Sequence, residues 1–262
     1  MPGSSWLDVI PFWAFFPLTV LLVVAAVEIG YRLGQYRRRQ NADEKEAAVG
    51  AMSAAALGLL AFFLAFTFGF AGARFDERRH AMIDEVNAIA TCFLRSRMLP
   101  VEHGAPVRKL LRQYVHERTE LTADNILSTI KHAEEIQRQL WTIAVEACEQ
   151  DRSAVTALFV SSLNEVFDLH TNRVTYGTRS RLPGVLWQSL ILTTILSMGV
   201  LGYLEGLSRS SRSPAIIAVV LTFAAVLTLI ADIDRPAEGN LRISPQLMID
   251  LDRQLQNETN TP

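Results

Sequence analysis

The sequence predicts an all-α membrane protein with four transmembrane helices and a soluble helical bundle inserted between the second and third of them. Of the 262 residues, 50% are hydrophobic and the mean hydropathy is +0.20. This value is too apolar for an ordinary charged domain and too polar for a chain of membrane spans alone. Four long apolar stretches and one charged insert with helical periodicity account for the mixture.

The four apolar stretches cover residues 12–31, 50–73, 185–204 and 214–231. Each is close to the roughly 20 residues that a helix needs to cross a bilayer. Helices follow because backbone groups in lipid have to be bonded within the segment. Four buried helices of a soluble core would need more amphipathic sequence around them than this chain provides. The N-terminus has no basic residue before the first stretch, so we expect that stretch to be retained rather than cleaved as a signal peptide.

The charged insert is predicted to be helical throughout, because Gly and Pro are scarce and apolar residues recur three and four apart. Breaks are predicted at "LPVEHGAP", at "EQDRSA", which has a capping lead-in, and at "TAD". The first helix of the insert is expected to continue the second span. The expected organisation is an N-terminal pair of transmembrane helices over 1–73, a soluble bundle over 74–183, a C-terminal transmembrane hairpin over 184–234 and a polar tail over 235–262.

The side of the membrane on which the bundle lies is left open by the charges. The loop after the first span holds five basic residues, against none in the N-terminal tail. The positive-inside rule would therefore put that loop in the cytoplasm. Arginines also crowd the span ends on the opposite side, and long translocated domains escape the rule. The count of charges does not choose between the two orientations.

The second span combines small residues and phenylalanines at four-residue spacing. Small residues let helix backbones approach closely, and helix association in lipid depends on such packing. The phenylalanines lie on a neighbouring face, where they either contact lipid and other spans or, in an oligomer, form stacked rings that gate ions by dewetting. The candidate helix-packing residues are Gly58, Ala61, Ala65 and Gly69, and the candidate pore-lining residues are Phe62, Phe66 and Phe70.

The stretch "FFLAFTFGFAGARFDERR" resembles the bestrophin anion channels, whose second span carries large apolar residues within an F-x-x-G-F core. The matching positions are Phe66, Gly69 and Phe70, with Phe62 one turn earlier. The resemblance implies a homopentamer whose pore neck is lined by these residues, and a bundle in the cytoplasm. Calcium-gated bestrophins carry an acidic cluster after the fourth span. Here "DIDRPAEGN" has too few carboxylates for the six to eight oxygen ligands of calcium, so calcium gating is not implied.

A second resemblance covers most of the chain. The stretches "RFDERRHAMIDEVNAIATCFLR", "RLPGVLW" and "ADIDRPAEGNLRISPQLMIDL" are similar to the landmarks of a bacterial membrane family described as bestrophin-like. This resemblance implies a multi-pass protein of the inner membrane.

Charged residues gather where the second and fourth spans end, and two interpretations apply to them. They form either a charged mouth that concentrates anions or structural pairs, with Asp234 and Arg235 bonded to Arg74 or Arg78. Glu85 lies on the margin of an apolar stripe and is expected in an interface or a polar network. The residues concerned are Arg74, Arg78, Arg79, Glu85, Asp232, Asp234 and Arg235.

The sequence carries no motif of an enzyme, a metal site, a cofactor site or a nucleic-acid module. Cys92 and Cys148 are either buried thiols or a disulfide. The small residues and phenylalanines of the second span, together with the resemblance to the bestrophins, imply a homo-oligomeric channel that contacts lipid and small ions, with anions favoured by the arginines. The alternative is a non-conducting scaffold or sensor whose bundle binds a partner protein.

Overall fold

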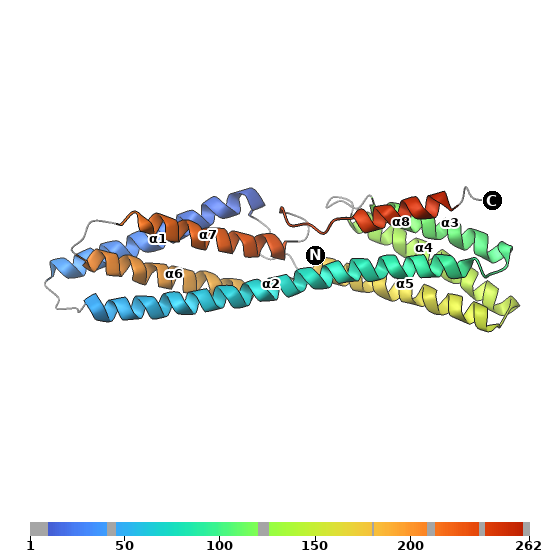
Figure 1. Cartoon of the computed structure of the whole chain (residues 1–262), viewed down its shortest axis with the longest axis horizontal. Coiled ribbons are helices and arrows are strands. Elements are labelled where there is room, and N and C mark those ends of the chain that lie inside the picture. Colours follow the sequence, from blue (N-terminus) through green and yellow to red (C-terminus); the bar gives the residue numbers. More distant parts are fainter. Residues whose placement is uncertain are drawn as a thin grey trace. The chain divides into compact units, whose positions relative to one another are not determined.

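Every regular element in the described part of the chain is a helix. The computed structural model describes residues 10–40, 46–119, 126–179, 181–208, 213–235 and 239–258. The chain forms two compact units (Figure 1). Unit 1 consists of residues 1–75 and 181–241, and unit 2 of residues 76–180 and 242–262. The sequence segments on either side of the insert therefore come together in unit 1.

Unit 1 contains the four helices that are long and apolar enough to cross a membrane in the described ranges. They are α1 (Phe12–Arg39), the first part of α2 (Glu46–Ser96), α6 (Gly184–Leu207) and α7 (Ala215–Asp234). Each predicted apolar stretch lies almost entirely within one of these helices, and α1 and α2 run well past the predicted ends. As expected, α2 continues beyond the apolar stretch as one uninterrupted helix.

The closest helix packing in unit 1 is between α1 and α6, along a glycine seam formed by Gly30, Gly34, Gly202 and Gly206. A Cβ atom added at Gly30 would lie 1.9 Å from the carbonyl oxygen of Gly199, and one added at Gly206 would lie 2.2 Å from the carbonyl oxygen of Tyr31. Backbone therefore contacts backbone directly, as in other small-residue membrane contacts. The sequence pattern predicted close packing for the second span and did not indicate this seam.

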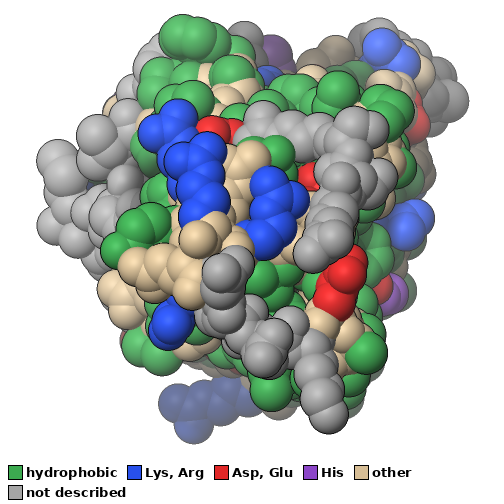
Figure 2. Space-filling view, turned by 90° about the vertical axis from the view of Figure 1, so that its left-hand side faces the viewer, with side chains coloured by type: hydrophobic (Ala, Val, Ile, Leu, Met, Phe, Trp, Pro, Cys, Tyr) green, Lys and Arg blue, Asp and Glu red, His purple; other side chains and the backbone are tan. Residues whose placement is uncertain are grey.

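Basic side chains gather at the end of unit 1 where α1 finishes (Figure 2). The last turn of α1 contains Arg37, Arg38 and Arg39, and cations at this position interact favourably with the helix dipole. A guanidinium N–H of Arg38 also donates a hydrogen bond of 2.6 Å to the carbonyl oxygen of Ser208, just past α6. One turn earlier, Arg32 pairs with Glu28 at 2.8 Å, so this carboxylate of the first span has a local partner.

Unit 2 is a bundle made of the second part of α2 with α3 (Val101–Thr119), α4 (Ile126–Gln150), α5 (Ala154–Arg179) and α8 (Gln246–Asn257). Helix α3 packs against α4 and α8, and α4 packs against α5. The helix α8 lies in the region that the sequence analysis treated as a polar tail. It buries Met248, Leu251 and Leu255 in the core of the bundle. The three- and four-residue spacing of these side chains was the available signal.

The predicted breaks in the bundle have local causes. The break before α5 is capped by Asp151, whose carboxylate accepts hydrogen bonds from the backbone N–H of Ser153 at 3.1 Å and from the hydroxyl of Thr156 at 3.1 Å. Hydrogen bonding by Ser153 and Thr156 lowers the pKa of Asp151. The break between α2 and α3 falls between Ser96 and Val101. The predicted break at residues 122–124 lies outside the described residues.

Candidate functional site

The apolar part of α2 carries an open face that no other part of unit 1 covers in the described chain. We define this open face by Gly58, Phe62, Ala65, Phe66 and Gly69, all of which are exposed. Phe62 is 67% exposed and Phe66 is 53% exposed. A Cβ atom added at Gly58 or Gly69 would have no atom within 4 Å. Ala61 is exposed beside this face. The four predicted helix-packing residues therefore face outward from the protomer.

Phe70 does not share the exposure of the other two phenylalanines. It is half-buried against the core of unit 1, and the guanidinium carbon of Arg74 lies 5.1 Å from the centroid of its ring. A step of four residues turns an α-helix by about 40° more than one full turn. From Phe62 to Phe70, successive phenylalanines therefore turn towards the protomer core. Two of the three predicted pore-lining residues, Phe62 and Phe66, lie on the open face.

The charged residues that continue the open face along α2 are acidic rather than basic. Asp76, His80 and Asp84 are exposed. His80 follows Phe62 by about five helical turns, and Asp76 and Asp84 flank it on the same side of the helix. The three arginines behave differently. Arg78 is buried, Arg74 contacts Phe70, and Arg79 is exposed about a quarter-turn away from the open face.

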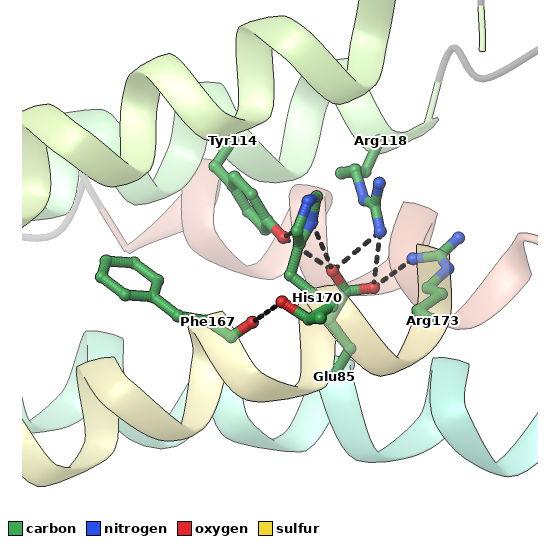
Figure 3. Close-up of polar contacts among 7 residues, drawn as sticks. Glu85, Tyr114, Arg118, Phe167, His170 and Arg173 are labelled. Carbon is green, nitrogen blue, oxygen red and sulfur yellow. Dashed lines mark hydrogen bonds and ion pairs between the residues drawn. The ribbon is translucent and has the colours of Figure 1, made fainter. Parts of the chain in front are cut away.

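Unit 2 contains a buried charge network centred on Glu85 of α2 (Figure 3). Arg118 of α3 donates hydrogen bonds of 2.9 and 3.1 Å from Nη2 to the two carboxylate oxygens. Arg173 of α5 donates one of 2.5 Å from Nη1 to Oε2. The hydroxyl of Tyr114, also on α3, donates one of 2.7 Å to Oε1. One carboxylate therefore joins three helices.

His170 completes the network from α5, with Nδ1 at 2.9 Å from the Tyr114 hydroxyl oxygen. An ionised carboxylate accepts hydrogen bonds only, so the single hydroxyl proton of Tyr114 is directed to Glu85. The Tyr114 oxygen is then left to accept a hydrogen bond through a lone pair, which assigns an N–H to Nδ1 of His170. The chain of donors runs from His170 through Tyr114 to Glu85.

The electrostatics of the network favour an ionised Glu85. Burial opposes ionisation, but the hydrogen bond with His170 and the charges of Arg118 and Arg173 outweigh it, and the pKa of Glu85 lies well below its usual range. Burial and the neighbouring carboxylate raise the pKa of Tyr114 well above its ordinary value. Burial acts against the charge of Arg118, yet the Tyr114 and Glu85 partners raise its pKa overall. The network therefore holds three helices together through charged hydrogen bonds. In the described part of the chain, no cluster of residues suits a metal ion.

The sequence placed Glu85 on the edge of an apolar stripe but did not identify its partners. Tyr114, Arg118 and His170 lie 29, 33 and more than 80 residues away along the chain. Contacts between residues so far apart leave no short-range pattern. The one available signal was that no Lys or Arg lies three or four residues from Glu85, so that its basic partner has to come from another helix.

Asp234 at the end of α7 is buried and bonded to the start of α6. Its Oδ1 accepts a hydrogen bond of 2.7 Å from the backbone N–H of Leu182, and its Oδ2 accepts one of 3.1 Å from the indole N–H of Trp187. The carboxylate thereby links the last turn of one apolar helix to the first turn of another. This contact supports a structural role for Asp234. Its expected pairing with Arg74 or Arg78 stays a prediction.

Asp232 and Arg235 are also buried and hold backbone segments of unit 1. Oδ1 of Asp232 accepts a hydrogen bond of 2.7 Å from the backbone N–H of Asn240. A Cβ atom at Gly239, which has a φ of +116°, would lie 2.0 Å from the same oxygen, so this turn requires glycine. Arg235 donates a hydrogen bond of 2.8 Å from Nη1 to the backbone carbonyl oxygen of Ile10.

The two cysteines are free thiols in different surroundings. Cys92 is fully buried, and burial raises its pKa to about 12, which makes it unreactive. Cys148 is half-buried on the surface of unit 2. Of the two alternatives from the sequence, the structure therefore has thiols and no disulfide between these residues.

Apolar helices of membrane-spanning length and a bundle of amphipathic helices define the chain as a helical membrane protein. The sequence profile of the Bestrophin-like domain matches residues 20–248. The chain belongs to the bestrophin-like family. The resemblance noted in the sequence is thereby confirmed.

Solved structures show the same fold. A crystal structure of a bacterial bestrophin homologue from Klebsiella pneumoniae matches with a TM-score of 0.68 and 17% identity, over 95% of this chain and 98% of that chain. Two single-residue variants of that homologue match with TM-scores of 0.68 and 0.67 and identities of 16% and 17%, over 95% and 94% of this chain and 99% and 98% of theirs. No curated protein matches the chain.

Proposed function

We propose that the protein is a homo-oligomeric ion channel of the inner membrane in which α2 of each copy lines a central path. The observation that carries the proposal is the open face of α2, where Phe62 and Phe66 are exposed and nothing else in the described protomer covers them. Membership of the bestrophin-like family and the four apolar helices support it. The pentamer implied by the bestrophin resemblance is part of the proposal.

Phe62 and Phe66 would form two stacked rings around the axis of the oligomer. A narrow ring of apolar side chains gates ions because water leaves it when it is closed. Gly58 and Gly69 lie on the same face above and below these rings. Their lack of side-chain volume would allow the helices of neighbouring copies to approach closely at these levels.

The exposed carboxylates that follow the open face along α2 favour cations rather than the anions that the arginines suggested. Asp76 and Asp84 follow the phenylalanines on the same side of α2 and would form rings of carboxylates in an oligomer. Rings of Asp or Glu select cations. Arg78 is buried and therefore does not contribute to a charged mouth.

The proposal places the bundle in the cytoplasm, as the bestrophin resemblance implies. The basic end of α1 would then face the other side of the membrane (Figure 2). This arrangement departs from the positive-inside rule for short loops. The orientation is therefore tested independently of conduction, at the scale of the whole molecule.

Sizing and bilayer recordings test the channel itself. The purified protein is sized in detergent by light scattering and then reconstituted for recording with wild type, Phe66→Ala and Phe68→Ala. Phe68 is the matched control, because it is an exposed phenylalanine on the opposite side of the same helix. Phe66→Ala is expected to raise conductance or open probability, because it widens the neck. Phe68→Ala is expected to leave the currents unchanged, and reversal potentials in a salt gradient are expected to show a preference for cations.

Two results would contradict the proposal. A monomeric protein has no central axis and would favour the non-conducting scaffold or sensor. Equal currents for Phe66→Ala and wild type would place Phe66 against lipid rather than in a pore.

A further inference from the structure

A groove lies between α4 and α5 on the surface of unit 2, next to the turn that joins them. One pocket of about 410 Å³ is lined by Trp141, Val145 and Val160 among others. A second pocket of about 760 Å³ shares Cys148, Ala157 and Val160 with the first. Trp141 and Val145 are each 42% exposed. Large apolar side chains grouped at a hollow in this way are typical of a protein interaction site.

A second group of exposed apolar side chains lies around the turn between α2 and α3 of the same unit. Leu94 is 52% exposed, Met98 is 64% exposed and Val101 is 78% exposed. We call this group the α2–α3 patch. In a ring of identical subunits each contact joins two different surfaces, so every copy needs one surface and its complement. The groove and the α2–α3 patch supply two such surfaces in the bundle.

The charges beside the two surfaces are complementary. Glu165 and Asp168 line the larger pocket of the groove and are exposed. Arg108 and Lys109 lie on α3 two turns after the α2–α3 patch, and Lys109 is exposed. Glu102 is the acidic exception beside the patch, and Arg152 is the basic exception in the smaller pocket of the groove, where Glu149 and Asp151 are acidic. Opposite charges at the edge of an interface guide its register and suppress wrong pairings.

The geometry points to a second copy of this chain as the occupant of the groove, which receives the α2–α3 patch of its neighbour. This assignment rests on the proposed homo-oligomer and adds the surface through which its bundles associate. Apolar contact between Met98 and the side chains of Trp141 and Val145 would form the centre of the interface, and the charged residues would form its rim. The repeated contact around the ring would close the oligomer on the bundle side.

The two cysteines make the contact testable by cross-linking. Cys148 lines the groove and Cys92 is buried, so wild type offers one usable thiol. Two differently tagged full-length chains are co-expressed, one wild type and one with Met98→Cys and Cys148→Ala. A short bismaleimide is then added to the purified oligomer. We expect covalent dimers between unlike tags, because position 98 of one copy reaches Cys148 of the next, and no product within either tag alone.

The matched control replaces Met98→Cys by Gln139→Cys, which lies on α4 on an exposed face away from the groove. It is expected to give no cross-link with Cys148 of another copy. Labelling of Cys148 with N-ethylmaleimide gives a second readout, and we expect protection in the oligomer and full labelling after denaturation.

The outcomes separate this assignment from the proposed channel. A monomer by light scattering overturns both. An assembled oligomer with freely labelled Cys148 and no unlike-tag dimer overturns the groove assignment and leaves the channel standing. Protection of Cys148 without the cross-link shows an occupant other than the α2–α3 patch and overturns the assignment as well.

Discussion

Glu85 shows how much of the bundle depends on a single carboxylate. It is fully buried and accepts hydrogen bonds from two arginines and a tyrosine that belong to two other helices. A buried charge is tolerated only when its partners satisfy it, and removal of one partner leaves the others uncompensated. In this network two guanidinium groups would remain without their anion.

Replacement of Glu85 by Gln is expected to destabilise the bundle by about 3–5 kcal/mol, because it leaves the buried Arg118 and the half-buried Arg173 beside a neutral amide. The measurement is denaturant unfolding of the detergent-solubilised protein at several pH values. The folded pKa of Glu85 is lowered from its ordinary value of 4.5, so the folded state binds fewer protons than the unfolded state as the pH falls below 4.5. The stability that Glu85 contributes is therefore present above this pH and lost below it.

The control is Asp84→Asn, which removes an exposed carboxylate from the neighbouring position of the same helix. It is expected to change stability by less than about 0.5 kcal/mol. If Glu85→Gln were as stable as wild type and kept the same loss of stability at acid pH, the network would not be a structural tie.

At the scale of the element, glycines in two helices have opposite surroundings. Those of the glycine seam contact backbone, whereas those on the open face of α2 contact nothing in the described protomer. The sequence predicted small-residue packing for α2, which stays a prediction, and did not identify the seam between α1 and α6. Spacing alone does not distinguish a seam filled within the chain from one that faces outward, because both need small residues every four positions.

Gly30→Ala is expected to destabilise unit 1 by at least about 1–3 kcal/mol, because the added methyl group overlaps the carbonyl oxygen of Gly199 and neither backbone is free to move aside. Gly50→Ala is the matched control. It lies in a membrane-type helix away from the open face, with no atom within 4 Å of an added Cβ. Alanine should be neutral or stabilising there, by up to about 1 kcal/mol from helix propensity. Thermal melting in detergent compares the two, and equal melting temperatures would contradict direct backbone packing at the seam.

The helices were predictable where one physical signal dominates. Long apolar stretches identified the four membrane-type helices of the described ranges, and the capping residues before α5 marked its start. Helix α8 was missed because it is short and its few apolar residues stand among polar ones. The open face was predictable from the spacing of Phe62 and Phe66, but the burial of Phe70 was not, since it depends on how α2 is rotated against its neighbours.

At the scale of the whole molecule, the orientation in the membrane is decided by cysteine accessibility. In a Cys148→Ala background, Gln40→Cys reports the basic end of α1 and Gln139→Cys reports the bundle. If the bundle is cytoplasmic, an impermeant maleimide added to spheroplasts should label Gln40→Cys at once and Gln139→Cys only after lysis. Cys92 is buried and gives no background. The reverse labelling would contradict the cytoplasmic bundle and agree with the positive-inside rule.

The change from apolar to charged sequence at both ends of the insert indicated the two units. The contacts that join the two apolar segments were not visible in the sequence. Residues 1–75 and 181–241 form unit 1, although more than a hundred residues separate them along the chain. The apolar character of both segments predicted that they share the bilayer. Arg235 joins the two segments through a hydrogen bond to the backbone carbonyl oxygen of Ile10, an acceptor that a sequence does not display.

The glycine seam also limits how the molecule moves. Side chains at an ordinary helix contact change rotamer and let the helices slide past one another, but a contact made of backbone atoms has no rotamers to change. Helices α1 and α6 therefore behave as one rigid pair. Any movement that widens the proposed neck would have to carry this pair as a single piece, and the freedom to move belongs to α2.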